Sequence, residues 1–207
     1  MKQFVVISLF LTLVSCLSEK TVTRKYYTIE TPGEISAPDT RPESVIPGIC
    51  EIQRPVVDPV FEKNQIANRR MSHEISYYMY HQWAVRPADA IWEFVYDVIR
   101  QSGLFREVSV RYSRMIPEYK ILTSVHKLEV VEINKSMSAH IDIGFRLVLN
   151  SNDSILVEHR ADRTEDMEEK NMNLFASEIS EIIFEELMTF SLMIGEKKQS
   201  LNSVEVR

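Results

Sequence analysis

The sequence predicts an α/β protein of the α+β kind, a two-layer sandwich in which a mostly antiparallel sheet carries two helices on one face. Three stretches predict it. Residues 69–110 have the pattern of strand, helix and strand, residues 119–163 that of three consecutive strands, and residues 175–190 that of a second amphipathic helix. Each helix has one apolar stripe, so both helices are expected to cover the same face of the sheet.

The unit at residues 69–110 is expected to organise the rest of the chain. Residues 75–82 alternate in a β-branched and aromatic pattern that is typical of a strand. Pro87 suits the first turn of a helix, where its missing N–H costs nothing. Gly103 is expected to end this helix in a left-handed conformation, and residues 105–110 to return as a strand. The apolar residues at helical spacing form one buried face: Ile91, Phe94, Val95, Val98 and Ile99.

The next unit is a meander of three strands. Residues 119–133 read as a long strand, residues 134–136 as a turn and residues 155–163 as the last strand. Between them, apolar side chains alternate with polar ones, which is typical of a sheet with one face on the core and one in water. We therefore expect Phe145→Ala to be costly and His140→Ala to cost little. The inward set is Ala139, Ile141, Ile143, Phe145, Leu147 and Leu149, and the outward set is His140, Asp142, Arg146 and Asn150.

The N-terminal part of the folded chain has weaker signals. Residues 26–30 are β-prone, and residues 31–48 hold four of the eight prolines, which predicts a loop or an extended crossing. Residues 49–57 read as a strand that ends at Pro59. Pro55 indicates that this strand lies at an edge or leaves the sheet early.

The C-terminal helix is expected to begin near the acidic run at residues 165–169, because negative charge is favourable at a helix N-terminus. The polar residues 196–207 are expected to form a flexible tail. The apolar stripe of the helix is Phe175, Ile179, Ile182, Ile183, Leu187 and Phe190.

Residues 1–15 have the features of a signal peptide. Lys2 supplies a basic start, residues 4–14 are mostly apolar, and Cys16 follows a small residue. The segment is too short to span a bilayer. A Cys in this position matches the lipobox of bacterial lipoproteins, whose cleaved N-terminal Cys is acylated, with chains such as palmitate; an ordinary secretory signal with an incidental Cys is the alternative. Cleavage would leave a lipidated tether at residues 16–25 and one domain at residues 26–195.

The composition of the mature chain restricts its partners. Removal of Lys2 leaves 23 basic against 30 acidic side chains, a net charge of −7. This charge argues against nucleic acid and against a polybasic attachment to anionic lipid, so the acyl chains are expected to hold the protein at the membrane. With Cys16 acylated, Cys50 is the sole remaining cysteine and no intramolecular disulfide can form.

No pattern in the sequence predicts catalysis, a cofactor or a metal. The five histidines lack ligand spacing, so hydrogen-bonded or solvated histidines are the favoured interpretation over a metal site. The chain has no G-x-S-x-G motif, and its five glycines form no phosphate-binding loop. We therefore expect a protein that is not an enzyme.

The aromatic strand at residues 75–83 is the most informative surface candidate. Tyr78, Tyr80 and Gln82 share one strand face, and Trp83 follows them. These side chains could all belong to the core or cover the sheet. Exposed aromatic residues also frequently anchor interfaces, so this face is a candidate for partner binding.

A family resemblance adds to this interpretation. The chain has Ile66-Ala-Asn-Arg69, then Tyr80-His-Gln-Trp83-Ala, then Pro87 at a helix start, then Leu104-Phe105 with Val108. In this order and spacing it resembles the ABC-type transport auxiliary lipoprotein component family, of which the paraquat-inducible auxiliary lipoproteins are members. The resemblance covers nearly the whole mature chain and implies a fold similar to the N-terminal domain of TolB.

The resemblance also implies a function. These lipoproteins are accessory subunits of envelope lipid transport, so the expected partner is a membrane-anchored mammalian-cell-entry-domain protein, and a homo-oligomeric ring is a further expectation. Leu17, in place of an inner-membrane retention Asp, favours the periplasmic face of the outer membrane. The alternative function is a periplasmic lipid-binding carrier or chaperone that holds acyl chains between helices and sheet.

Overall fold

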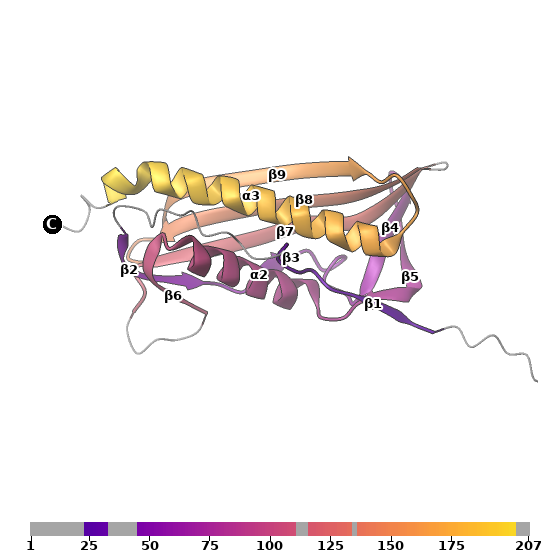
Figure 1. Ribbon diagram of the computed structural model, residues 1–207, viewed down its shortest axis with the longest axis horizontal. Coiled ribbons are helices and arrows are strands. Elements are labelled where there is room, and N and C mark those ends of the chain that lie inside the picture. The colour runs from indigo at the N-terminus through magenta and orange to yellow at the C-terminus, as the bar shows by residue number, and fades with distance from the viewer. Residues whose placement is uncertain (1–22, 33–44, 111–115, 134–135, 202–207) are drawn as a thin grey trace, which may run out of the picture.

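The protein folds into an open sheet with two helices on one side (Figure 1). The computed structural model describes residues 23–32, 45–110, 116–133 and 136–201, without the side chains of residues 198–201. The elements in this part of the chain are β1 (Lys25–Tyr27), β2 (Ile46–Ile52), β3 (Val56–Val57), β4 (Gln65–Met71), β5 (Glu74–Trp83), α2 (Pro87–Ser102), β6 (Phe105–Ser109), β7 (Tyr119–Ile133), β8 (Ser136–Leu149), β9 (Ser154–Asp166) and α3 (Met172–Leu201).

Strand β7 is the centre of the sheet. One of its edges pairs with β8 in an antiparallel ladder from Tyr119↔Leu149 to Ile133↔Ser136, and β9 extends β8. The other edge pairs in succession with β2, β3 and β4, all parallel to β7. Beyond β4 lie β5 and then β1, and beyond β2 lies β6. The predicted α+β class is confirmed, and the long ladders are antiparallel as expected.

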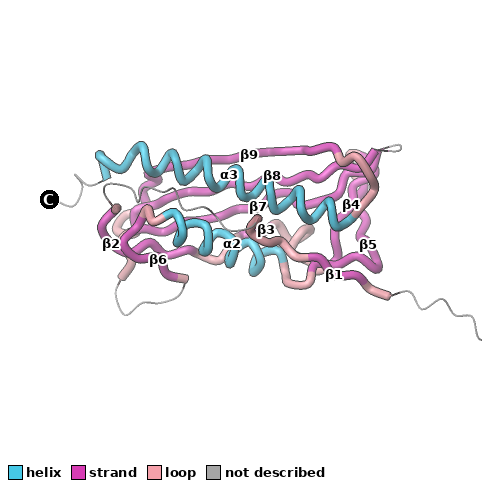
Figure 2. Tube along the Cα trace, viewed as in Figure 1, coloured by secondary structure: helices cyan, strands magenta, loops and turns pink. Residues whose placement is uncertain are grey.

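The short strands pair largely in parallel, which the sequence did not indicate. Five strand pairs among the described residues are parallel: β1–β5, β2–β6, β2–β7, β3–β7 and β4–β7. The turn residues of an antiparallel hairpin indicate its pairing within a few positions of the sequence. Parallel partners are distant in the sequence, so no local signal indicates their pairing. The two kinds of pairing give an elongated sheet that α3 follows along its length (Figure 2).

The core lies between the sheet and the helices, and both predicted helix stripes are buried in it. Pro87 begins α2, and Gly103 ends it in the left-handed region with φ 63°. Phe145 of β8 stacks on Phe190 of α3, with ring centroids 5.6 Å apart. The inward alternation of β8 is confirmed from Ala139 to Leu147, and Leu149 is half-buried at the end.

The N-terminal strands differ from the prediction in their bounds. Strand β2 begins at Ile46, inside the predicted loop, because Ile46 and Cys50 pair with β6. Pro55 lies in a break between β2 and β3, so the predicted single strand is two. Residues 33–44, most of the predicted loop, lie outside the described residues.

The C-terminal helix begins later and ends later than predicted. Glu165 and Asp166 belong to β9, where they pair with β8, so the acidic run does not start the helix. The Asn171 side chain instead accepts hydrogen bonds from the backbone N–H groups of Asn173 (2.8 Å) and Leu174 (3.4 Å). The helix continues through Gly195 to Leu201, into the predicted tail.

Candidate functional site

The aromatic strand β5 does not alternate as simply as the sequence predicts. Gln65 pairs with Gln82 whereas Ala67 pairs with Tyr77, so β5 has three more residues than β4 between these points. The extra residues form a bulge. As a result Tyr78 and His81, predicted on opposite faces, meet edge to face with ring centroids 5.5 Å apart.

The four predicted partner-binding residues are therefore separated. Trp83 is only 2% exposed and its ring lies against Phe175, so its side chain offers a partner no surface. Tyr78 is half-buried beside His81, and Gln82 is half-buried next to Tyr26 of β1. Tyr80 is exposed. Of the predicted set, Tyr80 and part of Gln82 remain accessible at the surface, while Cys16 lies outside the described residues.

A groove lies beside β1, where the described chain begins. It has a volume of about 460 Å³ and is open to solvent, and it joins strand residues to the start of α3. Two of its lining residues are in contact, with the Tyr27 hydroxyl 2.8 Å from His81 Nδ1. The desolvation of His81 lowers its pKa, helped by the nearby charge of Lys25. The lining mixes charged and aromatic side chains, which does not suit acyl chains.

The sheet face without helices carries a charged network that the sequence analysis missed. Glu129 of β7 is fully buried. Its Oε1 accepts hydrogen bonds from Arg69 Nε at 2.7 Å and from His140 Nδ1 at 3.2 Å. Asp162 accepts from the other His140 ring nitrogen at 2.7 Å and from Lys127 at 2.9 Å. His140 therefore donates from both nitrogens, which requires the protonated ring.

The electrostatics agree with this geometry. Burial alone would raise the pKa of Glu129, but hydrogen bonds from His140 and Arg69 hold it below the ordinary value. The hydrogen bond to Glu129, opposed by burial, raises the pKa of His140. His140 and Lys127 lower the pKa of Asp162.

These contacts correct the expectation that the outward face of β8 is simply wet. Asp142 is buried as well, and Arg160 of β9 covers it with two hydrogen bonds of 2.9 and 2.8 Å. His140→Ala is consequently no longer expected to cost little. The signal available in the sequence was Glu129 itself, a charged residue among the apolar neighbours of a long strand.

Within the described ranges, no group of three or more His, Cys, Asp or Glu side chains could hold a metal ion. Burial raises the pKa of the Cys50 thiol far above its ordinary value, so this thiol is unreactive. In the same part of the chain, no helix combines the length and apolar character that a membrane span requires.

Comparisons with known proteins agree with this description. The sequence profile of the family described as ABC-type transport auxiliary lipoprotein component matches residues 27–185. Protein XCC0632 from Xanthomonas campestris has a similar structure, with a TM-score of 0.67 and 15% identity, over 86% of this chain and 99% of that chain. An uncharacterized protein of solved structure is also similar, with a TM-score of 0.64 and 8% identity, over 83% and 99%. At these identities the likeness shows the fold alone. No curated protein matches the chain.

Proposed function

Because this chain belongs to the ABC-type transport auxiliary lipoprotein component family, we propose that it is a non-enzymatic accessory subunit of an envelope lipid-transport system. Cys16 would be acylated and would hold the protein at the periplasmic face of the outer membrane. The folded domain would then dock a mammalian-cell-entry-domain protein, the partner that the resemblance implies. The protein would thereby hold the transport complex at the membrane.

The observation that carries this proposal is the two-ended shape of the domain. The described chain begins with β1 at one end, beside the start of α3. The opposite end holds the start of β7, the β8–β9 turn and the late turns of α3 (Figure 1). Three exposed apolar side chains lie close to element starts at that end: Val45, Ile116 and Ile155. An anchor at one end leaves the other end free for a protein partner.

The filled core argues for an accessory subunit over a lipid carrier. A carrier needs an apolar cavity of the size of acyl chains between helices and sheet. In this protein Phe145, Phe175 and Phe190 are fully buried in that layer, and the rings of Phe145 and Phe190 are in contact. Native mass spectrometry of protein purified from membranes tests the alternative, since copurified phospholipid would support the carrier.

Pull-down of the mammalian-cell-entry partner by lipidated protein tests the docking surface. We expect the double variant Ile116→Asp with Ile155→Asp to keep its thermal midpoint and lose most of the partner, because it places charge on the far end. The double variant Tyr80→Ala with Gln82→Ala is the matched comparison at the tether end, and it should retain the partner. The reverse result would return the contact to the aromatic strand, and wild-type protein that binds no such partner would contradict the proposed function.

A further inference from the structure

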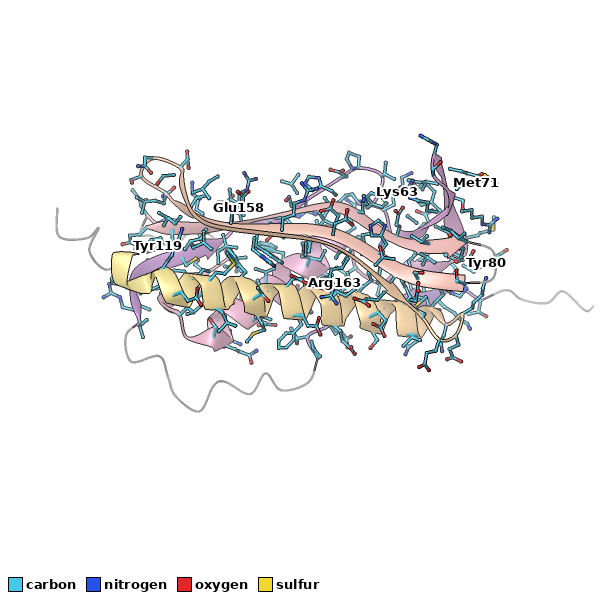
Figure 3. All side chains as sticks on the ribbon, turned by 90° about the horizontal axis from the view of Figure 1, so that it is seen from above. Lys63, Met71, Tyr80, Tyr119, Glu158 and Arg163 are labelled. Atoms are coloured by element: carbon cyan, nitrogen blue, oxygen red, sulfur yellow. The ribbon has the colours of Figure 1, made fainter. Side chains whose placement is uncertain are left out.

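The end of the domain where the described chain begins exposes an unusual group of apolar side chains, which we call the tether-end tip. Its members are Met71 at 68% exposure, Met79 at 70%, Ile133 at 54% and Tyr80 at 40%. They come from the β4–β5 hairpin and from the end of β7, which is distant in the sequence. Figure 3 shows Met71 and Tyr80 at the same end of the molecule, with Tyr119 at the other end.

Strand register explains why these residues gather. Strands β4 and β7 are parallel with Arg69 opposite Val131, and each strand ends two residues further on, at Met71 and at Ile133. The bulge in β5 falls between Tyr77 and Gln82, and Met79 and Tyr80 are exposed within it. The tip therefore depends on the pairing of β4 with β7 and on the bulge in β5.

The tip lies next to the point where the chain leaves towards Cys16. Strand β1 is parallel to β5 with Lys25 opposite His81, which places the start of β1 beside the bulge of β5. Seven peptide units separate Cys16 from Thr23, which limits their span to about 25 Å at full extension. Helix α3, with 30 residues, is about 45 Å long. An acylated Cys16 can thus reach the tip, whereas the far end of α3 lies beyond it.

We propose that the tether-end tip rests on the bilayer surface to which Cys16 is anchored, and that it sets the orientation of the domain on the membrane. This inference rests on the acylation of Cys16 in the proposed function. The tip then makes a second, shallow contact with lipid. Tyr80 suits the interfacial zone, where the ring meets apolar lipid and the hydroxyl meets water.

The charged residues of the tip set the depth of this contact. Arg70 is exposed beside Met71, Ser72 and His73 form the β4–β5 turn, and Glu74 follows at the start of β5. Charged side chains are costly in the hydrocarbon layer, so the turn must stay among the lipid headgroups. Met71, Met79 and Ile133 then reach only the boundary between headgroups and acyl chains.

Depth-dependent quenching in vesicles tests the proposal with full, lipidated protein. Single cysteines are introduced as Met79→Cys, Ile133→Cys and Leu192→Cys and are labelled with an environment-sensitive fluorophore. Leu192 is the matched control, because it is 67% exposed but lies late in α3. The native thiols do not interfere, since Cys16 is acylated and Cys50 is fully buried. The vesicles contain phosphatidylcholine and phosphatidylglycerol, with or without lipids that carry a nitroxide near the headgroup.

We expect quenching at positions 79 and 133 to be several-fold stronger than at position 192. Equal quenching at all three positions, or none at 79 and 133, would overturn the proposal. Disulfide-linked dimers of the Met79→Cys variant in vesicles would instead assign the tip to a second copy of the chain. If the soluble part of the mammalian-cell-entry-domain protein shielded the fluorophore at position 79 from quenching, the tip would be assigned to that protein. Either of these two results would overturn the membrane contact. Flotation with vesicles is measured first, so that a failure of acylation is distinguished from a failure of orientation.

Discussion

At the residue scale, Glu129 is the most constrained side chain of the helix-free face. It is fully buried, and its carboxylate is held by Arg69 and His140. Its second oxygen, Oε2, is buried without a hydrogen-bond partner. A buried charge is tolerated only while its partners remain, and the loss of one leaves the charge uncompensated.

The variant Arg69→Met should therefore lower the free energy of unfolding by about 3 kcal/mol, since a broken buried pair is costly and His140 compensates only in part. Arg146→Met is the control, because the Arg146 side chain is 43% exposed and its Nε lies 4.0 Å from Glu158 Oε1, at the limit of an ion pair. The control should cost less than about 0.5 kcal/mol. Chemical denaturation measures both, and equal costs would mean that the network contributes little.

His140 makes stability depend on pH. Its pKa in the folded state is raised above the ordinary 6.5, so the protonated ring stabilises the fold below that value. This contribution is lost as the pH rises through the folded-state pKa. The pKa values of Glu129 and Asp162 are lowered from 4.5 and 3.8, so their contributions are lost as the pH falls below those values.

We expect the variant His140→Asn to remove the alkaline part of this dependence. The unfolding free energy of the wild type should decline as the pH rises above 6.5, and that of the variant should stay flatter. Thermal or denaturant unfolding across this range measures the difference in unfolding free energy between the two proteins. The contributions of the other histidines are the same in both proteins and therefore do not affect this difference. Parallel curves would show that His140 is not protonated in the folded state.

At the scale of single elements, two glycines should respond in opposite ways to the same substitution. Gly48 has φ +95°, and a Cβ there would lie 2.8 Å from Glu118 Oε2, which accepts the N–H of Ile49 at 2.6 Å. Gly195 lies in α3, where an added Cβ finds its nearest atom, on Leu104, at 4.0 Å. We expect Gly48→Ala to cost about 1–3 kcal/mol. Gly195→Ala should stabilise by about 0.5–1 kcal/mol, because alanine loses less backbone entropy in a helix.

Differential scanning calorimetry of the two glycine variants would show opposite shifts of the thermal midpoint. A stabilised Gly48→Ala variant would contradict the positive φ. A destabilised Gly195→Ala variant would contradict a helix that continues past this position.

Strand β8 supplies the strongest test of the core. Phe145 is fully buried against Phe190, so Phe145→Ala should cost about 3–5 kcal/mol. Glu158→Ala, on the exposed side of β9, should change stability by less than about 0.5 kcal/mol. Denaturant midpoints decide the order of the two variants, and a reversed order would mean that the faces of the sheet are assigned backwards.

At the scale of the whole molecule, attachment and folding should be separable. We expect Cys16→Ala to abolish incorporation of labelled fatty acid, because acylation requires the thiol, while the thermal midpoint of the domain stays unchanged. Metabolic labelling and calorimetry measure the two effects. Equal label in the wild type and the variant would contradict the lipoprotein interpretation, and a lowered midpoint would show that the anchor contributes to folding.

The sequence by itself determined the elements whose signals are local. Pro87 and Gly103 bound α2 as predicted, and β7 has the predicted bounds Tyr119–Ile133. Hydrophobic periodicity and turn residues act over a few positions, so they are readable without a partner. The helix stripes and the inward face of β8 followed from the same signals.

Tertiary structure alone decided what depends on partners that are distant in the sequence. The parallel pairings of β7 with β2, β3 and β4 carry no local mark. The bulge in β5 separates Tyr78 from Tyr80, and pairing with β8 keeps Glu165 in a strand. Glu129, Arg69 and His140 meet only because three strands place them side by side. A charge is stable inside a fold only where distant strands supply its counter-charges, and short sequence patterns do not encode that placement.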